Sequence, residues 1–172
     1  LTGWSRTRFG FLHLAFQEYL AACEIVRLQG KDAHQALALA SRLGESWWRE
    51  VGLLAVALKG SPFFEPFARA LLTQPDILLH SDFLRACLQD AADPTPEPFV
   101  ELLTLRHEQD PALWDRQLVA LWILQENAPE RLAALKSHLR RHPDPRIAAH
   151  FTERLVQRFI ETQRGGCKLA HV

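Results

Sequence analysis

Residues 8–22 read Arg8-Phe9-Gly10-Phe11-Leu12-His13-Leu14-Ala15-Phe16-Gln17-Glu18-Tyr19-Leu20-Ala21-Ala22, and the spacing of their apolar side chains changes at His13. Phe9 and Phe11 alternate as in a short β-strand. After His13 the apolar residues follow helical spacing, which predicts a helix with Phe16, Tyr19, Leu20 and Cys23 on one side. His13 is therefore expected at a strand-to-helix junction, where unpaired amides and the helix dipole favour a phosphate group.

The same stretch carries a family resemblance. FGFLHLAFQEYLAA resembles the end of the winged-helix domain in NACHT-type STAND NTPases, whose pattern runs aromatic-x-Phe-Leu/Ile-His-x-x-Phe-Gln-Glu-Tyr/Phe-x-Ala-Ala. In that family the histidine contacts the phosphates of bound ADP in the inactive state, and the resemblance gives this role to His13. The matching residues are Phe9, Phe11, Leu12, His13, Phe16, Gln17, Glu18, Tyr19, Ala21 and Ala22.

The composition is that of a soluble globular protein without a strong overall charge. The 172 residues include 20 basic and 20 acidic side chains and no Met, and the chain begins at Leu1, so we expect a piece of a longer polypeptide. The charge is unevenly spread, with 3 basic and 10 acidic residues in 74–127 but 9 basic and 4 acidic in 128–172. No global field points to nucleic acid or to a membrane surface.

The cysteines and the hydrophobic runs indicate a cytoplasmic setting. Cys23, Cys87 and Cys167 are far apart and form no C-x-x-C pair, which argues against a disulfide framework and against a zinc knuckle. The longest nearly apolar run, Val51 to Leu58, is too short to span a bilayer.

The chain after His13 reads as a series of helices. A first helix is predicted from His13 to Gln29, stopped at Gly30, and a second from Asp32 to Leu43. A third begins at Glu45 and is expected to be buried on most sides. Its apolar stripe contains Trp47, Val51, Leu54 and Leu58, broadened by Trp48, Leu53 and Ala57. The Trp-rich run also resembles the segment that follows the winged helix in NACHT proteins.

Prolines mark the expected helix starts beyond Gly60, because a proline at the first helical position loses no hydrogen bond. Alternate members of the set lie about 34 residues apart, the size of an α-solenoid unit of two helices. A stretch rich in proline and acid, 90–98, is the expected internal linker, and a last helix is predicted to bury Ile147, Phe151, Leu155 and Phe159. The marking prolines are Pro62, Pro75, Pro96, Pro111, Pro129 and Pro145.

The predicted fold is therefore all-α: an irregular HEAT-like α-solenoid or helical bundle, preceded by the last strand and helix of a winged-helix domain. The expected divisions are 1–30 as the end of the winged-helix domain, 31–93 and 94–164 as two parts of a helical arm, and 165–172 as a tail.

The chain lacks the motifs of a complete enzyme. It contains neither a Walker A loop of the form G-x-x-x-x-G-K-[ST] nor a Walker B strand, and no H-E-x-x-H or G-x-S-x-G sequence. His138 and His142 are spaced to share a metal, but the arginines between them favour a solvated helix end. The basic residues of 136–158 lack interleaved aromatics, which disfavours nucleic-acid binding.

The resemblance implies a regulatory or sensor fragment of a STAND NTPase that couples nucleotide state to conformational change and oligomerisation in signalling or anti-phage defence. ADP or ATP with Mg would be held by an upstream NTPase core, whose phosphates His13 would contact; the fragment alone would bind no cofactor or metal. Its partners would be that core and other copies of the protein, together with a protein ligand or downstream effector domain. The alternative is an α-solenoid interaction scaffold in which His13 is structural and Phe9, Phe11, Phe16 and Tyr19 are core.

Overall fold

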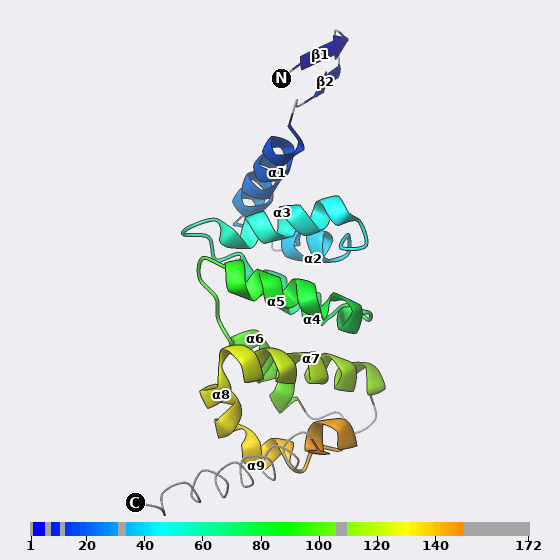
Figure 1. Ribbon diagram of the computed structural model, residues 1–172, viewed down its shortest axis with the longest axis vertical. Helices are drawn as coiled ribbons and strands as arrows, with labels where there is room; N and C mark the ends of the chain where they lie inside the picture. The colour runs from blue at the N-terminus through cyan, green and yellow to red at the C-terminus, as the bar shows by residue number, and fades with distance from the viewer. Residues whose placement is uncertain (1, 6–7, 11–12, 31–33, 106–109, 150–172) are drawn as a thin grey trace, which may run out of the picture. The chain divides into compact units, whose positions relative to one another are not determined.

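The computed structural model describes residues 2–5, 8–10, 13–30, 34–105 and 110–149 (Figure 1). Apart from one two-stranded hairpin, the regular secondary structure of these residues is helical, so the predicted all-α class is confirmed. They form two compact units, Leu1–Pro98 and Phe99–Val172. The elements are β1 (Thr2–Ser5), β2 (Arg8–Gly10), α1 (Leu14–Gln29), α2 (Gln35–Ala40), α3 (Ser46–Ala57), α4 (Phe64–Leu72), η1 (Ile77–His80), α5 (Ser81–Asp90), α6 (Glu97–Thr104), α7 (Pro111–Asn127), α8 (Pro129–Ala134) and α9 (Lys136–Leu139), followed by helical residues 145–149.

A hairpin precedes the first helix. β1 and β2 pair antiparallel, with Thr2 opposite Gly10 and Gly3 opposite Phe9. The alternation of Phe9 and Phe11 predicted only the second of these strands, and Phe11 itself lies outside the described residues. α1 then begins directly after His13 and ends at Gln29, with Gly30 at its C-cap, as predicted.

The prolines mark helix starts as the sequence suggested. Pro111 and Pro129 are the first residues of α7 and α8, and Pro145 opens the helical residues 145–149. The other three lie one or two residues before α4, η1 and α6. Proline has a fixed φ angle and no backbone N–H group, so it is suited to the position at or just before the first residue of each helix.

The first unit contains two layers of paired helices. Figure 1 shows α2 and α3 in one layer and α4 and α5 in the next; α2 packs against α4 and α3 against α5, while α1 packs against α3. Burial of large apolar side chains between these helices supplies the main stabilisation. The largest fully buried ones in this unit are Phe63, Phe64, Phe67, Leu71, Ile77 and Leu84.

The buried face of α3 differs from the predicted stripe. Its fully buried residues are Val51, Gly52, Ala55 and Val56, whereas Leu54 and the two tryptophans are half-buried and Ala57 is exposed. α2 is also shorter than predicted, since it begins at Gln35 and ends at Ala40. Small residues on α3 permit a close approach to the aromatic rings of α4 and α5.

Gly52 is expected to tolerate no larger side chain. A Cβ there would meet Phe83 Cζ at 3.0 Å and Phe67 Cζ at 3.3 Å. We therefore expect Gly52→Val to lower the free energy of unfolding of the first unit by about 1–3 kcal/mol through overpacking. Native-state hydrogen exchange of the α4 and α5 amides measures this.

Gly44→Val is the matched control, because a Cβ at Gly44 would have nothing within 4 Å. It should change the same free energy by no more than about 0.5 kcal/mol. Equal effects of the two substitutions would contradict the packing seen at Gly52.

The second unit is built around α7. Residues 117–121 of this helix are all buried, together with Ile123 and Leu124. Asp110 caps the helix, since its Oδ1 accepts a hydrogen bond of 3.0 Å from the Ala112 amide. Phe99 and Leu103 of α6 and Leu139 and Ile147 near the end of the described chain complete the apolar core. Of the residues predicted to be buried in the last helix, Phe151, Leu155 and Phe159 lie outside the described residues.

None of the described helices combines the length and hydropathy needed to cross a lipid bilayer. Cys23 and Cys87 are free thiols, and Cys167 lies outside the described residues. Burial raises the pKa of the Cys87 thiol above its ordinary value, so this cysteine is held in its neutral, unreactive form.

Candidate functional site

His13 lies at the N-cap of α1, with an extended backbone at φ −121° and ψ 123°. Its carbonyl accepts a hydrogen bond of 3.2 Å from the Phe16 amide, which starts the helix. The side chain is exposed and does not cap the helix; its ring centroid lies 6.1 Å from that of Phe16. The His13 imidazole therefore makes no hydrogen bond to the helix that it begins, and it is accessible to a binding partner.

The N-terminal half of α1 carries an uncovered apolar face, which we call the α1 face. The prediction that Phe16 and Tyr19 belong to the core is wrong for the described residues, since their exposed fractions are 62% and 47%. The helical spacing correctly placed these side chains together, but no described element packs over them. The α1 face consists of Phe16, Tyr19 and Leu20; Leu14 is also exposed but lies on the opposite side of the helix.

The C-terminal half of α1 anchors the helix in the first unit. Ala22 is fully buried and Ile25, Val26 and Leu28 are half-buried, where α1 packs against α3. The Gln29 side chain accepts a hydrogen bond of 2.9 Å from the Ala36 amide at the start of α2. α1 is thus held at one end and presents His13 and the α1 face at the other.

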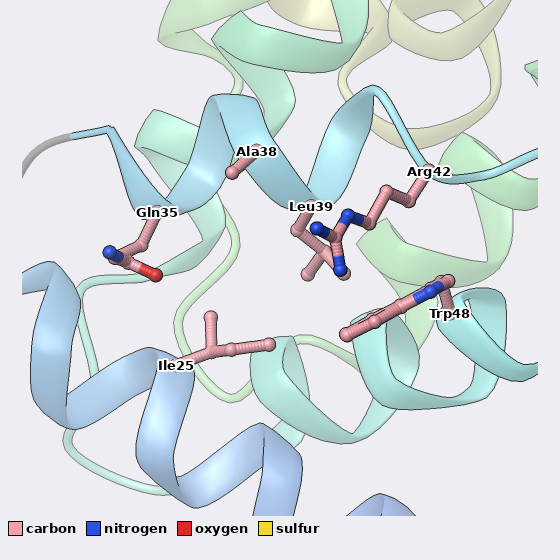
Figure 2. A pocket seen from close by; sticks show the side chains of 6 residues that line it. All are labelled: Ile25, Gln35, Ala38, Leu39, Arg42 and Trp48. Atoms are coloured by element: carbon pink, nitrogen blue, oxygen red, sulfur yellow. The ribbon is translucent and has the colours of Figure 1, made fainter.

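A pocket lies between α1, α2 and α3, as Figure 2 shows. Ile25, Ala38 and Leu39 give it an apolar lining, and the Arg42 guanidinium lies 4.8 Å from the centre of the Trp48 ring. Its volume of about 140 Å³ is small beside the roughly 300–1,000 Å³ of typical ligand sites. The pocket is better explained as packing sealed by a cation–π contact than as a binding site.

The histidine pair near the end of the described chain is not arranged as a metal site. His142 Nε2 lies 2.9 Å from Gln117 Oε1, and His142 Nδ1 accepts a hydrogen bond of 3.1 Å from the Asp144 amide. Both ring nitrogens are therefore engaged, and no group of three metal-ligating side chains occurs among the described residues. The expected solvated helix end is wrong for His142, which is half-buried.

The basic residues of 136–158, which we call the basic patch, are partly neutralised by acidic neighbours. Arg146 Nη2 lies 2.8 Å from Asp115 Oδ1 and 2.9 Å from Asp144 Oδ2. Burial of Asp144 opposes its ionisation, but hydrogen bonds from Arg146 outweigh this and leave the pKa of Asp144 below its ordinary value. Arg154 and Arg158, two further members of the patch, lie outside the described residues.

Sequence reasoning missed the polar cluster that joins Asp115, Gln117, His142, Asp144 and Arg146. One local signal pointed to part of it: an aspartate directly before a proline is a typical N-cap, and Asp144 Oδ1 accepts a hydrogen bond of 2.8 Å from the Arg146 amide. The remaining partners come from α7 and could not be read from local spacing.

Two features of the described residues can therefore bear on function: the junction of His13 with the α1 face, and the buried polar cluster of the second unit. Neither contains the nucleophile, base and oxyanion donors of a complete catalytic site. Comparisons with family models, with curated protein sequences and with solved structures found no match to this chain.

Proposed function

We propose that this chain is the regulatory part of a NACHT-type STAND NTPase: the end of a winged-helix domain followed by a HEAT-like helical arm. The observation that carries the proposal is the position of His13. It is exposed at the start of a helix, directly after a hairpin, and the aromatic side chains that follow it in FGFLHLAFQEYLAA are uncovered.

This geometry suits contact with a bound nucleotide. The amides of Leu14 and Ala15, the first two of α1, have no acceptors within the helix, and the positive end of the helix dipole lies beside the imidazole. No side chain caps these amides within the described residues. A phosphate oxygen could accept hydrogen bonds from the amides and from the imidazole together.

The α1 face fits the same arrangement. Three large side chains in contact with water, on one face of one helix, are typical of a surface that another protein part covers. In the proposed switch, the NTPase core covers this face when ADP is bound, and His13 ties the core to the arm. Exchange of ADP for ATP releases both contacts and permits oligomerisation.

The arm would transmit this change. In the first unit α2 packs on α4 and α3 packs on α5 in successive layers, which supports a solenoid-like construction. The alternative function is an interaction scaffold of the same construction without a nucleotide role. It predicts that His13 affects neither nucleotide binding nor release.

The test is ADP release from the parent protein, the longer chain that would contain the NTPase core. We expect His13→Ala to speed ADP dissociation by about 10- to 100-fold, since a hydrogen bond to a charged group contributes about 1.5–3 kcal/mol. Gln17→Ala, another exposed position on α1, is the control and should leave the rate unchanged.

Equal ADP retention in His13→Ala and in the unaltered protein would remove the proposed role of His13. A parent chain without a Walker A loop would favour the scaffold instead.

A further inference from the structure

His142 is held in one protonation state by its two neighbours. The Asp144 amide can only donate, so His142 Nδ1, 3.1 Å away, must carry a lone pair. The proton of the neutral ring is then on Nε2, which donates to Gln117 Oε1 at 2.9 Å. The two hydrogen bonds therefore assign the tautomer of His142. A second proton, on Nδ1, would break the bond from the Asp144 amide.

Gln117 is itself held in the orientation in which its Oε1 accepts the hydrogen bond from His142 Nε2. Its side chain is fully buried, and its amide nitrogen donates to the carbonyls of Leu102 and Leu105 at 3.0 and 2.9 Å. Leu102 lies in the last turn of α6 and Leu105 directly follows the helix, where carbonyls lack their usual helical partners; the Leu102 carbonyl also accepts a hydrogen bond of 3.3 Å from the Leu105 amide. Because both amide protons are used there, Oε1 has to face His142.

The surrounding charges come from three places. Asp144 and Arg146 belong to the turn that follows His142, Asp115 of α7 pairs with Arg146, and His138 lies on α9. Burial lowers the pKa of His142 below its ordinary value, the Asp144 carboxylate opposes this, and His138 adds to it. The end of α6 contributes the carbonyl oxygens of Leu102 and Leu105 to the cluster.

We infer that His142 is a pH-responsive latch, whose neutral ring ties residues 140–149 to α6 and α7 and whose protonation loosens them. A proton taken from solvent at Nδ1 replaces the lone pair with a donor that faces the Asp144 amide, and the hydrogen bond between them is lost. Nε2 keeps its hydrogen bond to Gln117, but the backbone at Asp144 loses its link, through the imidazole and Gln117, to the end of α6.

The response should be local. Leu139 and Ile147, on either side of the turn, are fully buried and do not titrate, so they retain their apolar contacts. The ion pair of Arg146 with Asp115, at 2.8 Å, does not involve the His142 ring and also persists. Loosening of 140–149 therefore leaves the rest of the chain folded.

The sign of the pH dependence follows from linkage. The loosened segment binds a proton with the ordinary histidine pKa of about 6.5, and the latched segment binds it only at lower pH. The latch is thus fully effective above about pH 6.5 and weakens as pH falls toward the pKa of the latched ring.

Hydrogen exchange of the full chain at about pH 7.5 and about pH 5.0 tests the latch, with protection factors corrected for intrinsic exchange. Protection of residues 140–149 should fall several-fold, with an upper limit of about 30-fold set by the ordinary histidine pKa. His142→Gln cannot be protonated at this position. Whatever level of protection residues 140–149 have in this variant, it should be the same at both pH values. His138→Gln should keep the fall.

Three results would overturn the latch: protection of 140–149 that does not change with pH, a fall that persists in His142→Gln, or a fall that disappears in His138→Gln. An equal fall in the amides of α3–α5 would also do so, since it would show general acid destabilisation.

Discussion

Replacing Phe67 with alanine is expected to lower the free energy of unfolding of the first unit by about 3–5 kcal/mol. Phe67 is fully buried on α4, stacked on Phe63 with ring centroids 5.3 Å apart and edge-on to Phe83 at 6.3 Å. Its removal loses the transfer free energy of the ring and opens a cavity beside Gly52 that rigid aromatic neighbours cannot fill. Native-state hydrogen exchange of the α4 and α5 amides measures the loss.

Phe16→Ala is the matched control, since it deletes the same side chain from an exposed helix position. It should change the free energy of unfolding by no more than about 0.5 kcal/mol. A loss as large as that of Phe67→Ala would mean that the α1 face is covered within this chain, and would remove one support for the proposed docking of an NTPase core.

The contrast between these two phenylalanines shows what periodicity can and cannot predict. Spacing in the sequence correctly grouped Phe16 with Tyr19 and Leu20 on one side of α1. Whether a helix face is buried depends on the element that packs over it, and helical spacing contains no information about that element. The same kind of pattern therefore describes the core around Phe67 and the uncovered α1 face.

Helix boundaries were more predictable than helix packing. Proline acts through its own backbone, so Pro111 and Pro129 located the starts of α7 and α8. On α3, by contrast, the buried face centres on Gly52 and Ala55, which hydrophobicity alone ranks below the tryptophans. The aromatic rings of Phe67 and Phe83 on the neighbouring helices leave room there only for small side chains.

The His13 junction and the polar cluster around His142 also differ in how far they could be predicted from the sequence. The strand-to-helix transition predicted the place of His13, because its position depends on residues next to it in the chain. The cluster around His142 depends on Gln117, 25 residues earlier. Such pairing arises from tertiary packing and leaves no periodic signal.

Gln117→Leu is expected to lower the free energy of unfolding of the second unit by about 2–4 kcal/mol. Leucine has a similar volume, so the cost comes from the lost hydrogen bonds of Gln117 to the carbonyls of Leu102 and Leu105 and to His142 Nε2. Of these groups, the Leu102 carbonyl keeps a second bond, from the Leu105 amide. A buried polar group left unpaired costs about 1–3 kcal/mol, and partial access to water limits the sum. Hydrogen exchange of the α7 amides measures the effect.

Gln89→Leu, at an exposed position of α5, is the control, and its free energy of unfolding is expected within about 0.5 kcal/mol of that of the unaltered chain. A double-mutant cycle of Gln117→Leu with His142→Leu then separates their mutual contact from the rest. Because the two side chains share one hydrogen bond, the combined loss should be about 1–2 kcal/mol smaller than the sum of the single losses. Additive losses would mean that the two side chains act independently, and the end of α6 would then be held by Gln117 alone.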